Sequence, residues 1–322
     1  MEEEKQSFGR LLQASFKSED TEEWLDVWFT RPIGLVFALF WNRLGVHPNA
    51  ITILSIFLGA AAGWMFHYTD LQHNMAGVAL LMSANFCDST DGQMARLTGK
   101  KTLIGRMLDG FSGDVWFFCI YLAIVFRLWH QNILGTSHEW GIFALVLAFI
   151  AGVLCHSRQS SLADYYRQIH LWFLKGKAGS ELDTSEKQDE VYRNLPKKGS
   201  FWARKFYFNY ANYCRSQEKR TPRFQKLYKH LLRKYGEIEN MPTELKTLFL
   251  EDSRKLMPLT NILTFNVRAI AIYITCLADC TWVYLLFEIT IMQLLYVYMH
   301  RRHEQLCKTL LEFDLNENNN KE

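Results

Sequence analysis

The sequence lacks several patterns that would assign it to a secreted or cysteine-metal class of protein. Its seven cysteines show no metal-type pairing, and their scatter indicates buried thiols in a reducing environment rather than a disulfide framework. The first residues, MEEEK, are acidic and no apolar stretch follows them, so we expect no cleavable signal peptide. No internal repeat is found. Only 21% of the 322 residues are charged, whereas 49% are hydrophobic.

The hydrophobic residues are gathered into six apolar runs. They occupy residues 51–66, 75–87, 103–128, 140–155, 262–277 and 281–299. A membrane-spanning helix needs about 20 residues, or about 17 if it is short. The second run is shorter, and we expect the polar segment after it to extend its helix into a wet cavity. Aromatic residues lie near the ends of the runs, as they do at membrane interfaces. The predicted fold class is an all-α integral membrane protein with six transmembrane helices.

These runs divide the chain into six expected regions. A polar N-terminal tail (1–22) precedes an aromatic-rich interfacial helix (23–47), which we expect to lie on the bilayer. Spans one to four follow (48–156), with Asn49 as the expected N-cap of the first. A basic cytoplasmic insert of helical character (157–258) separates them from spans five and six (259–300). A polar C-terminal tail (301–322) completes the chain.

Lysine and arginine in the short connections predict the orientation of the spans. The connections 68–74 and 129–139 contain neither residue, whereas 96–106 and the region after 156 are rich in both. The segment after the second span is therefore expected on the cytoplasmic side, together with both termini. Arg268 and Glu288 lie inside the last two runs, where they either pair with each other or face a cavity. Asp279, between these runs, is expected to be only a loop residue.

The insert is strongly basic. Residues 157–258 contain 21 Lys and Arg against 12 Asp and Glu, a net charge of +9, whereas the whole chain carries only +3. A stretch in which aromatic and basic residues alternate is compatible with nucleic-acid binding. In a chain with six spans, contact with anionic lipid headgroups is the better interpretation, and no nucleic-acid partner is expected. The stretch 176–199 is interpreted as a linker.

Between the second and third runs, residues 88–114 read DSTDGQMARLTGKKTLIGRMLDGFSGD and contain four carboxylates. Asp88 and Asp91 are three residues apart, which places them on nearly one face of a helix. Asp109 and Asp114 begin the next apolar run and can meet the first pair across a helix–helix contact. Carboxylates in apolar surroundings need a compensating cation. Because the cluster contains no His or Cys, it suits hard ions such as Mg²⁺ or Mn²⁺ and indicates phosphate chemistry at a membrane.

This segment resembles the signature of the CDP-alcohol phosphotransferases, D-x2-D-G-x2-A-R-x8-G-x3-D-x3-D, which are integral membrane enzymes of phospholipid synthesis. Seven residues match it position for position: Asp88, Asp91, Gly92, Ala95, Arg96, Gly105 and Asp109. Seven fixed residues at fixed offsets rarely coincide by chance. The resemblance extends more weakly to the PNAIT run at residues 48–52.

The resemblance implies a role for each matching residue. Asp88, Asp91 and Asp109, with a fourth aspartate, would hold Mg²⁺ or Mn²⁺, two ions in all. Gly92 and Ala95 would leave room for the CDP moiety, since small residues let a ligand approach the backbone. Further residues are assigned to the same CDP-activated substrate or to its acceptor: Arg96, Gly105, Asn49 and Arg158. The resemblance also implies a homodimer.

The last position of the signature departs from the pattern. The fourth acid is expected at residue 113, which is glycine here, and Asp114 follows it. On a regular helix residue i+5 is turned by about 140° from residue i, whereas i+4 is turned by about 40°. A one-residue π-bulge near Gly110 and Gly113 would restore the facing of Asp114. With such a bulge Asp114 would be both a metal ligand and the catalytic base; without it, the protein has lost the fourth acid.

Several functions remain compatible with the sequence. The preferred one is transfer of a phosphatidyl group from CDP-diacylglycerol to an alcohol or alcohol phosphate, with release of CMP. The first alternative is transfer of a phospho-alcohol from a CDP-alcohol to a diacylglycerol-type lipid. The second is a catalytically impaired membrane homologue. A transporter is disfavoured, because the acids gather at one membrane face rather than in paired broken helices at the midplane.

Overall fold

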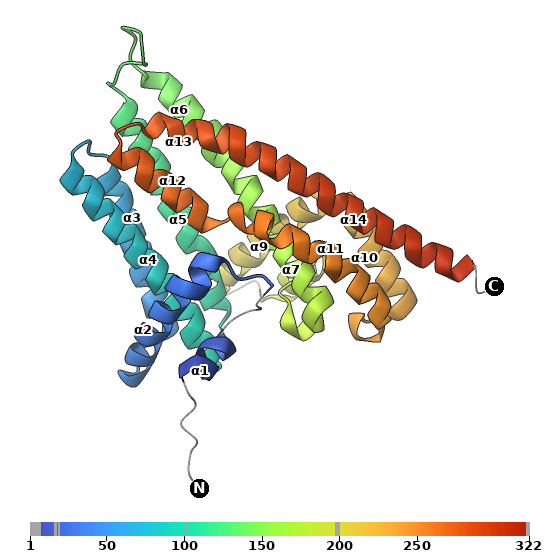
Figure 1. Cartoon of the computed structure of the whole chain (residues 1–322). Coiled ribbons are helices and arrows are strands. Elements are labelled where there is room, and N and C mark those ends of the chain that lie inside the picture. Colours follow the sequence, from blue (N-terminus) through green and yellow to red (C-terminus); the bar gives the residue numbers. More distant parts are fainter. Residues whose placement is uncertain (1–7, 16–17, 19, 101, 197–199, 320–322) are drawn as a thin grey trace. The chain divides into compact units, whose positions relative to one another are not determined.

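The computed structural model describes residues 8–15, 18, 20–100, 102–196 and 200–319, and it is helical almost throughout (Figure 1). Within these ranges there is no β-strand, only an isolated bridge between Asn132 and Glu139. The α-helices are α1 (Phe8–Ser15), α2 (Arg31–Arg43), α3 (Pro48–Phe66), α4 (Leu71–Thr98), α5 (Leu103–Leu128), α6 (Gly141–Phe149), α7 (Ser157–Gly179), α8 (Ser185–Asn194), α9 (Phe201–Arg220), α10 (Pro222–Tyr235), α11 (Thr243–Ile262), α12 (Phe265–Leu277), α13 (Thr281–Phe287) and α14 (Gln293–Asn319). Short π or 3₁₀ helices are η1 (Asp26–Thr30), η2 (Ile150–His156), η3 (Ile238–Asn240) and η4 (Glu288–Met292). The predicted all-α class is confirmed.

Five helical stretches are long and apolar enough to cross a membrane. They are Pro48–Phe66, Met107–Leu128, Gly141–Gly179, Thr243–Leu277 and Thr281–Asn316. Helix α4, which contains the short second run, is not among them, because its C-terminal third carries the polar residues of the motif. The membrane character is thus supported, and the sixth span remains a prediction.

The chain divides into two compact units. Unit 1 comprises Met1–Arg158 and Phe265–Gln293, and unit 2 comprises Gln159–Thr264 and Leu294–Glu322. Unit 1 therefore contains the whole acidic motif, together with the helices on either side of it. Unit 2 contains most of the basic insert and most of α14.

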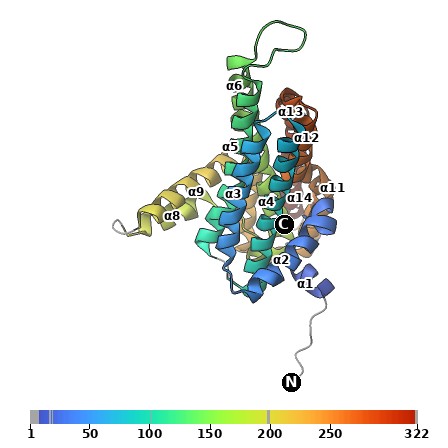
Figure 2. The same ribbon diagram turned by 90° about the vertical axis from the view of Figure 1, so that its left-hand side faces the viewer.

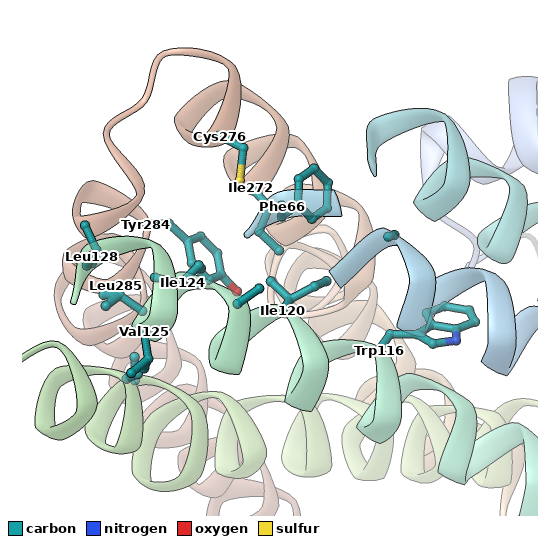
Figure 3. Close-up of a cluster of buried hydrophobic side chains, with 14 of the residues drawn as sticks. Phe66, Trp116, Ile120, Ile124, Val125, Leu128, Ile272, Cys276, Tyr284 and Leu285 are labelled. Carbon is teal, nitrogen blue, oxygen red and sulfur yellow. The ribbon is translucent and has the colours of Figure 1, made fainter. Parts of the chain in front are cut away.

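The core of unit 1 forms around α3, which packs against α4 on one side and α5 on the other (Figure 2). Figure 3 shows the buried side chains that α5 contributes, among them Trp116, Ile120 and Ile124, beside Phe66 of α3 and Tyr284 of α13. Glycines let α3 approach α5 closely. A Cβ built on Gly59 would overlap the ring of Trp116, and one on Gly63 would lie 2.7 Å from the Cβ of Cys119.

Helix α2 packs on the motif-bearing part of α4. The carbonyl of Gly34 accepts a hydrogen bond from the Thr90 hydroxyl at 3.3 Å. A Cβ on Gly34 would lie 2.7 Å from Nε2 of Gln93 and 2.8 Å from Oγ of Ser89, so glycine allows the contact. The aromatic side chains of Trp24 and Trp28, on the N-terminal side of α2, are more than 70% exposed. Such exposure supports the interfacial position predicted for this segment, which stays a prediction.

The two ionisable residues noted inside the last apolar runs pair with each other. Nε of Arg268 lies 2.9 Å from Oε1 of Glu288, and both side chains are buried. The hydroxyl of Tyr284 also donates to that carboxylate oxygen, at 3.1 Å. Of the two interpretations left open by the sequence, the structure supports the ion pair.

Unit 2 is a helical bundle, and two of its helices differ from expectation. The stretch interpreted as a linker contains α8, so that interpretation is wrong for Ser185–Asn194. Glu218 of α9 binds both the backbone N–H and the hydroxyl of Ser185, at 2.7 and 2.5 Å, and so fixes the start of α8. Of the residues expected as a C-terminal tail, 301–319 lie in α14 and 320–322 lie outside the described residues. In α14, Asp314 is fully buried and accepts hydrogen bonds from His230 and Lys234 of α10 at 2.7 and 2.9 Å.

Arg127 joins four segments of unit 1 at the end of α5. Its fully buried guanidinium donates to the Asp279 carboxylate, to Oδ1 of Asn74 and to the carbonyls of Phe66 and Cys276, all between 2.7 and 3.2 Å. Asp279 is held at a φ of 50°, an uncommon conformation for a residue other than glycine. Asp279 is therefore an anchor for Arg127 rather than only a loop residue.

Replacing Arg127 should destabilise the protein strongly. Arg127→Met leaves the Asn74 amide and two backbone carbonyls without their buried donor, so we expect the free energy of unfolding to fall by about 3 kcal/mol. Chemical unfolding of the detergent-solubilised chain measures this loss. Lys308→Gln is the control, because Lys308 and Glu312 form a solvent-exposed pair and should contribute at most about 0.5 kcal/mol. Equal losses for the two variants would show that Arg127 has no such role.

Candidate functional site

The acidic motif lies where α4 meets the start of α5. Oγ of Ser112 lies 3.1 Å from Oδ1 of Asp88 and 2.7 Å from the carbonyl oxygen of Asp109. The hydroxyl of this serine can therefore donate to the Asp88 carboxylate or to the Asp109 backbone one turn earlier, and it places α5 beside Asp88. Asp88 is half-buried, Asp91 is buried and Asp109 is exposed. Three of the predicted metal-binding residues thus face one junction between two helices.

Asp91 is the most deeply placed of these carboxylates. The apolar run of α4 ends at Cys87, and Asp91 lies beyond it with only 4% of its surface exposed. Burial, followed by the negative charges of Asp88 and Asp109, raises the pKa of Asp91 to about 9. A hydrogen bond from Thr52 opposes this rise. Oδ2 of Asp91 is buried without a hydrogen-bond partner. A cation at this junction would offset the repulsion from Asp88 and Asp109 and so lower this pKa.

The PNAIT run supplies a second wall of the site from α3. The prediction that Asn49 is the N-cap is wrong: α3 begins at Pro48, and Nδ1 of His47 accepts from the Asn49 N–H at 3.2 Å. The Asn49 side chain instead reaches α5, where a Cβ on Gly105 would lie 2.9 Å from its Oδ1. Glycine is needed at 105 because the asparagine occupies the space of a side chain. With Thr52 on Asp91, both polar residues of the run reach the motif.

Arg96 stands one turn after Gly92 on α4. A Cβ on Gly92 would meet the guanidinium of Arg96 at 3.5 Å, an ordinary contact distance. Nε and Nη2 of Arg96 are buried without hydrogen-bond partners. Burial and the charge of Arg31 lower the pKa of Arg96 to about 10, while Glu22, Asp109 and Asp91 raise it. Arg96 remains a cation at neutral pH, with two donors that suit a phosphate oxygen.

The region of the fourth acid is a regular helix. α5 is α-helical from Leu103 to Leu128, so the predicted π-bulge near Gly110 and Gly113 is wrong. The hydrogen-bonding of α5 continues through both glycines, and the π-helical turns of unit 1 lie elsewhere, in η1, η2 and η4. Asp114 is exposed and, as the fifth residue after Asp109, it is turned by about 140° from it. A Cβ on Gly113 would meet no atom within 4 Å. The position that matches the signature is therefore open but has no acid.

For two other predicted site residues, the structure gives the position on a helix and the burial. Ala95 is half-buried on α4, on the turn that follows Asp91. Arg158 is exposed in the first turn of α7, and within the described ranges no hydrogen bond or ion pair joins it to the motif. The roles assigned to both residues remain predictions.

The donor set fits a divalent cation in its chemistry. All the candidate ligands are carboxylates, and hard cations prefer oxygen ligands. One buried carboxylate oxygen, Oδ2 of Asp91, lacks a hydrogen-bond partner. In the conformation seen here, the described residues include no three His, Cys, Asp or Glu side chains close enough to enclose an ion. Asp88, Asp91 and Asp109 are the residues that would hold one, with substrate or water oxygens supplying the remaining ligands.

Comparisons with known proteins identify the segment that contains this site. Residues 45–169 match the CDP-alcohol phosphatidyltransferase family. The chain is also 39% identical, over 67 residues, to the archaetidylinositol phosphate synthase of Pyrococcus horikoshii. That alignment covers 20% of this chain and 34% of the relative, so the chain spans about a third of the curated relative it matches. The resemblance read from the motif is confirmed to this extent: residues 45–169, which include the whole motif, match the model of the CDP-alcohol phosphatidyltransferase family.

Sequence reasoning missed several residues around the motif. Gln93 donates from Nε2 to the Arg31 carbonyl at 3.0 Å, and Arg31 pairs with Glu22 at 3.1 Å. Ser112, which bonds Asp88, was also missed. A signal for Ser112 existed, since residue i+3 after Asp109 lies near the same helix face. No local signal marks Arg31 and Glu22, which come to α4 only through the packing of α2.

The raised pKa of Asp91 predicts a pH dependence for the metal-free protein. In the unfolded chain the pKa is near 3.8, so between about pH 4 and pH 9 only the folded state holds the proton. Stability must then fall as pH rises through this window. Asp91→Asn should remove that slope, as measured by thermal unfolding in detergent with a chelator at several pH values. Asp252→Asn, an exposed site, should keep it, and an unchanged slope in Asp91→Asn would contradict the assignment.

Proposed function

We propose that this protein is a metal-dependent transferase of phospholipid synthesis. It moves a phosphatidyl group from CDP-diacylglycerol to an alcohol or alcohol phosphate. The acceptor oxygen attacks the phosphorus that carries the diacylglycerol, the bond from that phosphorus to the CMP phosphate oxygen breaks, and CMP leaves. The observation that carries the proposal is the junction of Asp88, Asp91 and Asp109 with a buried, unpartnered carboxylate oxygen and two unpartnered donors of Arg96.

The residues of the site have complementary tasks in this reaction. Asp88, Asp91 and Asp109 would hold the divalent ions, which neutralise pyrophosphate charge and so lower the barrier to displacement. Arg96 binds a phosphate oxygen of the nucleotide through the donors that lack protein partners. Gly92 and Ala95 leave the α4 backbone accessible to the nucleotide. Asn49 fixes the start of α5 against α3 by filling the space beside Gly105.

The curated relative supports the choice of acceptor. It is named for the synthesis of an inositol-phosphate lipid. An alcohol phosphate is therefore the acceptor class that we favour, with Arg158 as a residue that could contact its phosphate. The reverse chemistry, transfer of a phospho-alcohol to a diacylglycerol-type lipid, uses the same motif and is the alternative. Lys and Arg in the connections predict that the site faces the cytoplasm.

The regular helix around Gly113 favours a second candidate, a catalytically impaired homologue. In this case the protein binds metal and CDP-activated lipid but transfers the group slowly, because no base stands at position 113. Asp114 points away from Asp109 and cannot replace that base without a change in α5. Activity measurements distinguish the two candidates directly.

The transferase proposal is tested by measuring the release of CMP from CDP-diacylglycerol. The assay contains Mg²⁺ or Mn²⁺ and a pool of alcohols and alcohol phosphates. Asp91→Asn and Asp109→Asn should each lower acceptor-dependent release at least a hundredfold, because each removes a metal ligand. Asp252→Asn should leave it unchanged. Release that survives both motif changes would refute the proposal. If the parent releases nothing, the same assay with CDP-alcohols and diacylglycerol examines the reverse chemistry.

Gly113→Asp tests where the fourth acid belongs. The open space around residue 113 accepts the side chain, and a positioned general base contributes about a hundredfold or more. We therefore expect Gly113→Asp to raise CMP release at least tenfold over the parent. Gly110→Asp, also in open space but three residues earlier, is the matched control. A parent rate that Asp114→Asn abolishes and Gly113→Asp does not raise would assign the base to Asp114.

A further inference from the structure

Unit 2 contains a cavity whose lining is strongly basic. Its volume is about 610 Å³, and it lies among the end of α9, the start of α10 and the middle of α14. Figure 1 shows α14 running beside α10, and hydrogen bonds between the two helices confirm their contact. Five of the lining side chains are cations: Lys219, Arg220, Arg223, Arg301 and Arg302. Cations from three helices thus converge on one cavity.

These charges are not neutralised by the protein. Across the described ranges, no carboxylate forms an ion pair with any of the five cations. Glu304 also lines the cavity, but its two carboxylate oxygens accept the backbone N–H groups of Arg223 and Phe224 at 2.8 and 3.3 Å. The Glu304 carboxylate therefore caps the N-terminus of α10. With five cations and one carboxylate, the lining carries an excess of positive charge.

Arg220 and His300 give the cavity fixed polar groups. Nη2 of Arg220 donates to Oγ of Ser216 at 2.8 Å, while its Nη1 is buried and has no partner. Nδ1 of His300 is 2.6 Å from the hydroxyl of Tyr166, which is 1% exposed. A buried tyrosine thus fixes the ring of His300, and Ser216 fixes the guanidinium of Arg220. Such prior positioning lowers the entropy that a ligand must lose on binding.

We propose that this cavity binds a phosphate-bearing anion. Arginine and lysine side chains converging without acidic partners favour a ligand with several negative charges, and arginine matches the geometry of phosphate oxygens. The volume lies in the range of small-molecule sites. An apolar ligand would leave the cations unpaired. The residues lie outside segment 45–169, so the site does not depend on the transferase proposal.

The position in the sequence indicates two sources for the phosphate. His300, Arg301 and Arg302 directly follow the apolar run 281–299, and basic residues that follow a membrane span attract anionic lipid headgroups. The same chemistry would also hold a soluble phosphorylated compound. A headgroup bearing a phosphate monoester and a free phosphate compound therefore share one binding mode, and they can be separated by experiment.

Calorimetric titration of the full chain in non-ionic detergent tests the site with three probes: inorganic pyrophosphate, dioctanoyl phosphatidic acid and dioctanoyl phosphatidylcholine. We expect phosphatidic acid to bind and phosphatidylcholine not to bind. The double variant Arg220→Gln, Arg302→Gln should bind phosphatidic acid at least tenfold more weakly. Arg233→Gln is the matched control, because Arg233 is exposed on α10 and outside the cavity. Unfolding temperatures should match the parent, and Arg220→Lys should retain part of the affinity.

The outcomes separate the sources and can overturn the proposal. Binding of phosphatidic acid without pyrophosphate assigns the cavity to a lipid headgroup, whereas binding of both assigns it to phosphate itself. No binding of either anion would overturn the proposal. An equal loss in Arg233→Gln and in the double variant would also overturn it, because the affinity would then belong to the basic surface as a whole. CMP release is not a readout here, so failure of the transferase proposal would leave this result unaffected.

Discussion

The site depends on the cost of holding several carboxylates together at the end of an apolar helix. Asp91 is buried beside Asp88 and Asp109, and their mutual repulsion adds to its loss of hydration. Packing of α2 and α3 against α4, and of α5 against α3, keeps these groups close despite that repulsion. A protein held in this way would bind a cation with part of the ordering already completed before binding. The aspartates need a cation, whereas the buried donors of Arg96 need an anion. A phosphate bound to a metal ion would meet both needs.

Much of the fold could be predicted from the sequence, because hydropathy and helix length respond to simple constraints. Five of the six apolar runs lie in helical stretches that are long and apolar enough to cross a membrane, whereas the run in α4 does not. The structure of the insert could not be predicted in the same way. The start of α8 depends on Glu218, 33 residues later, and α14 is held by the buried Asp314. Such long-range polar contacts leave no periodicity in the local sequence.

The candidate site likewise has a part that the sequence predicted and a part that it did not. The motif spacing predicted that Asp88 and Asp91 lie near one helix face. In the structure, the Ser112 hydroxyl of α5 lies 3.1 Å from the Asp88 carboxylate. The facing of Asp114 was predicted from the assumption that an acid in an apolar run must have a partner. The structure instead keeps α5 a regular α-helix, with Asp114 exposed on another side of it from Asp109. Glycine can weaken a helix, but by itself it does not create a π-turn.

The open space at Gly113 has a consequence for how this chain can change. Two of the four glycine codons become aspartate codons by a single base substitution, and the other two become glutamate codons. A Cβ at residue 113 would meet no neighbouring atom within 4 Å. Mutation would therefore offer the missing acid repeatedly in any large population, and sterics would not reject it. If glycine persists at this position among descendants of this gene, selection on function must keep it there. The identity of residue 113 is then a record of what the protein is required to do.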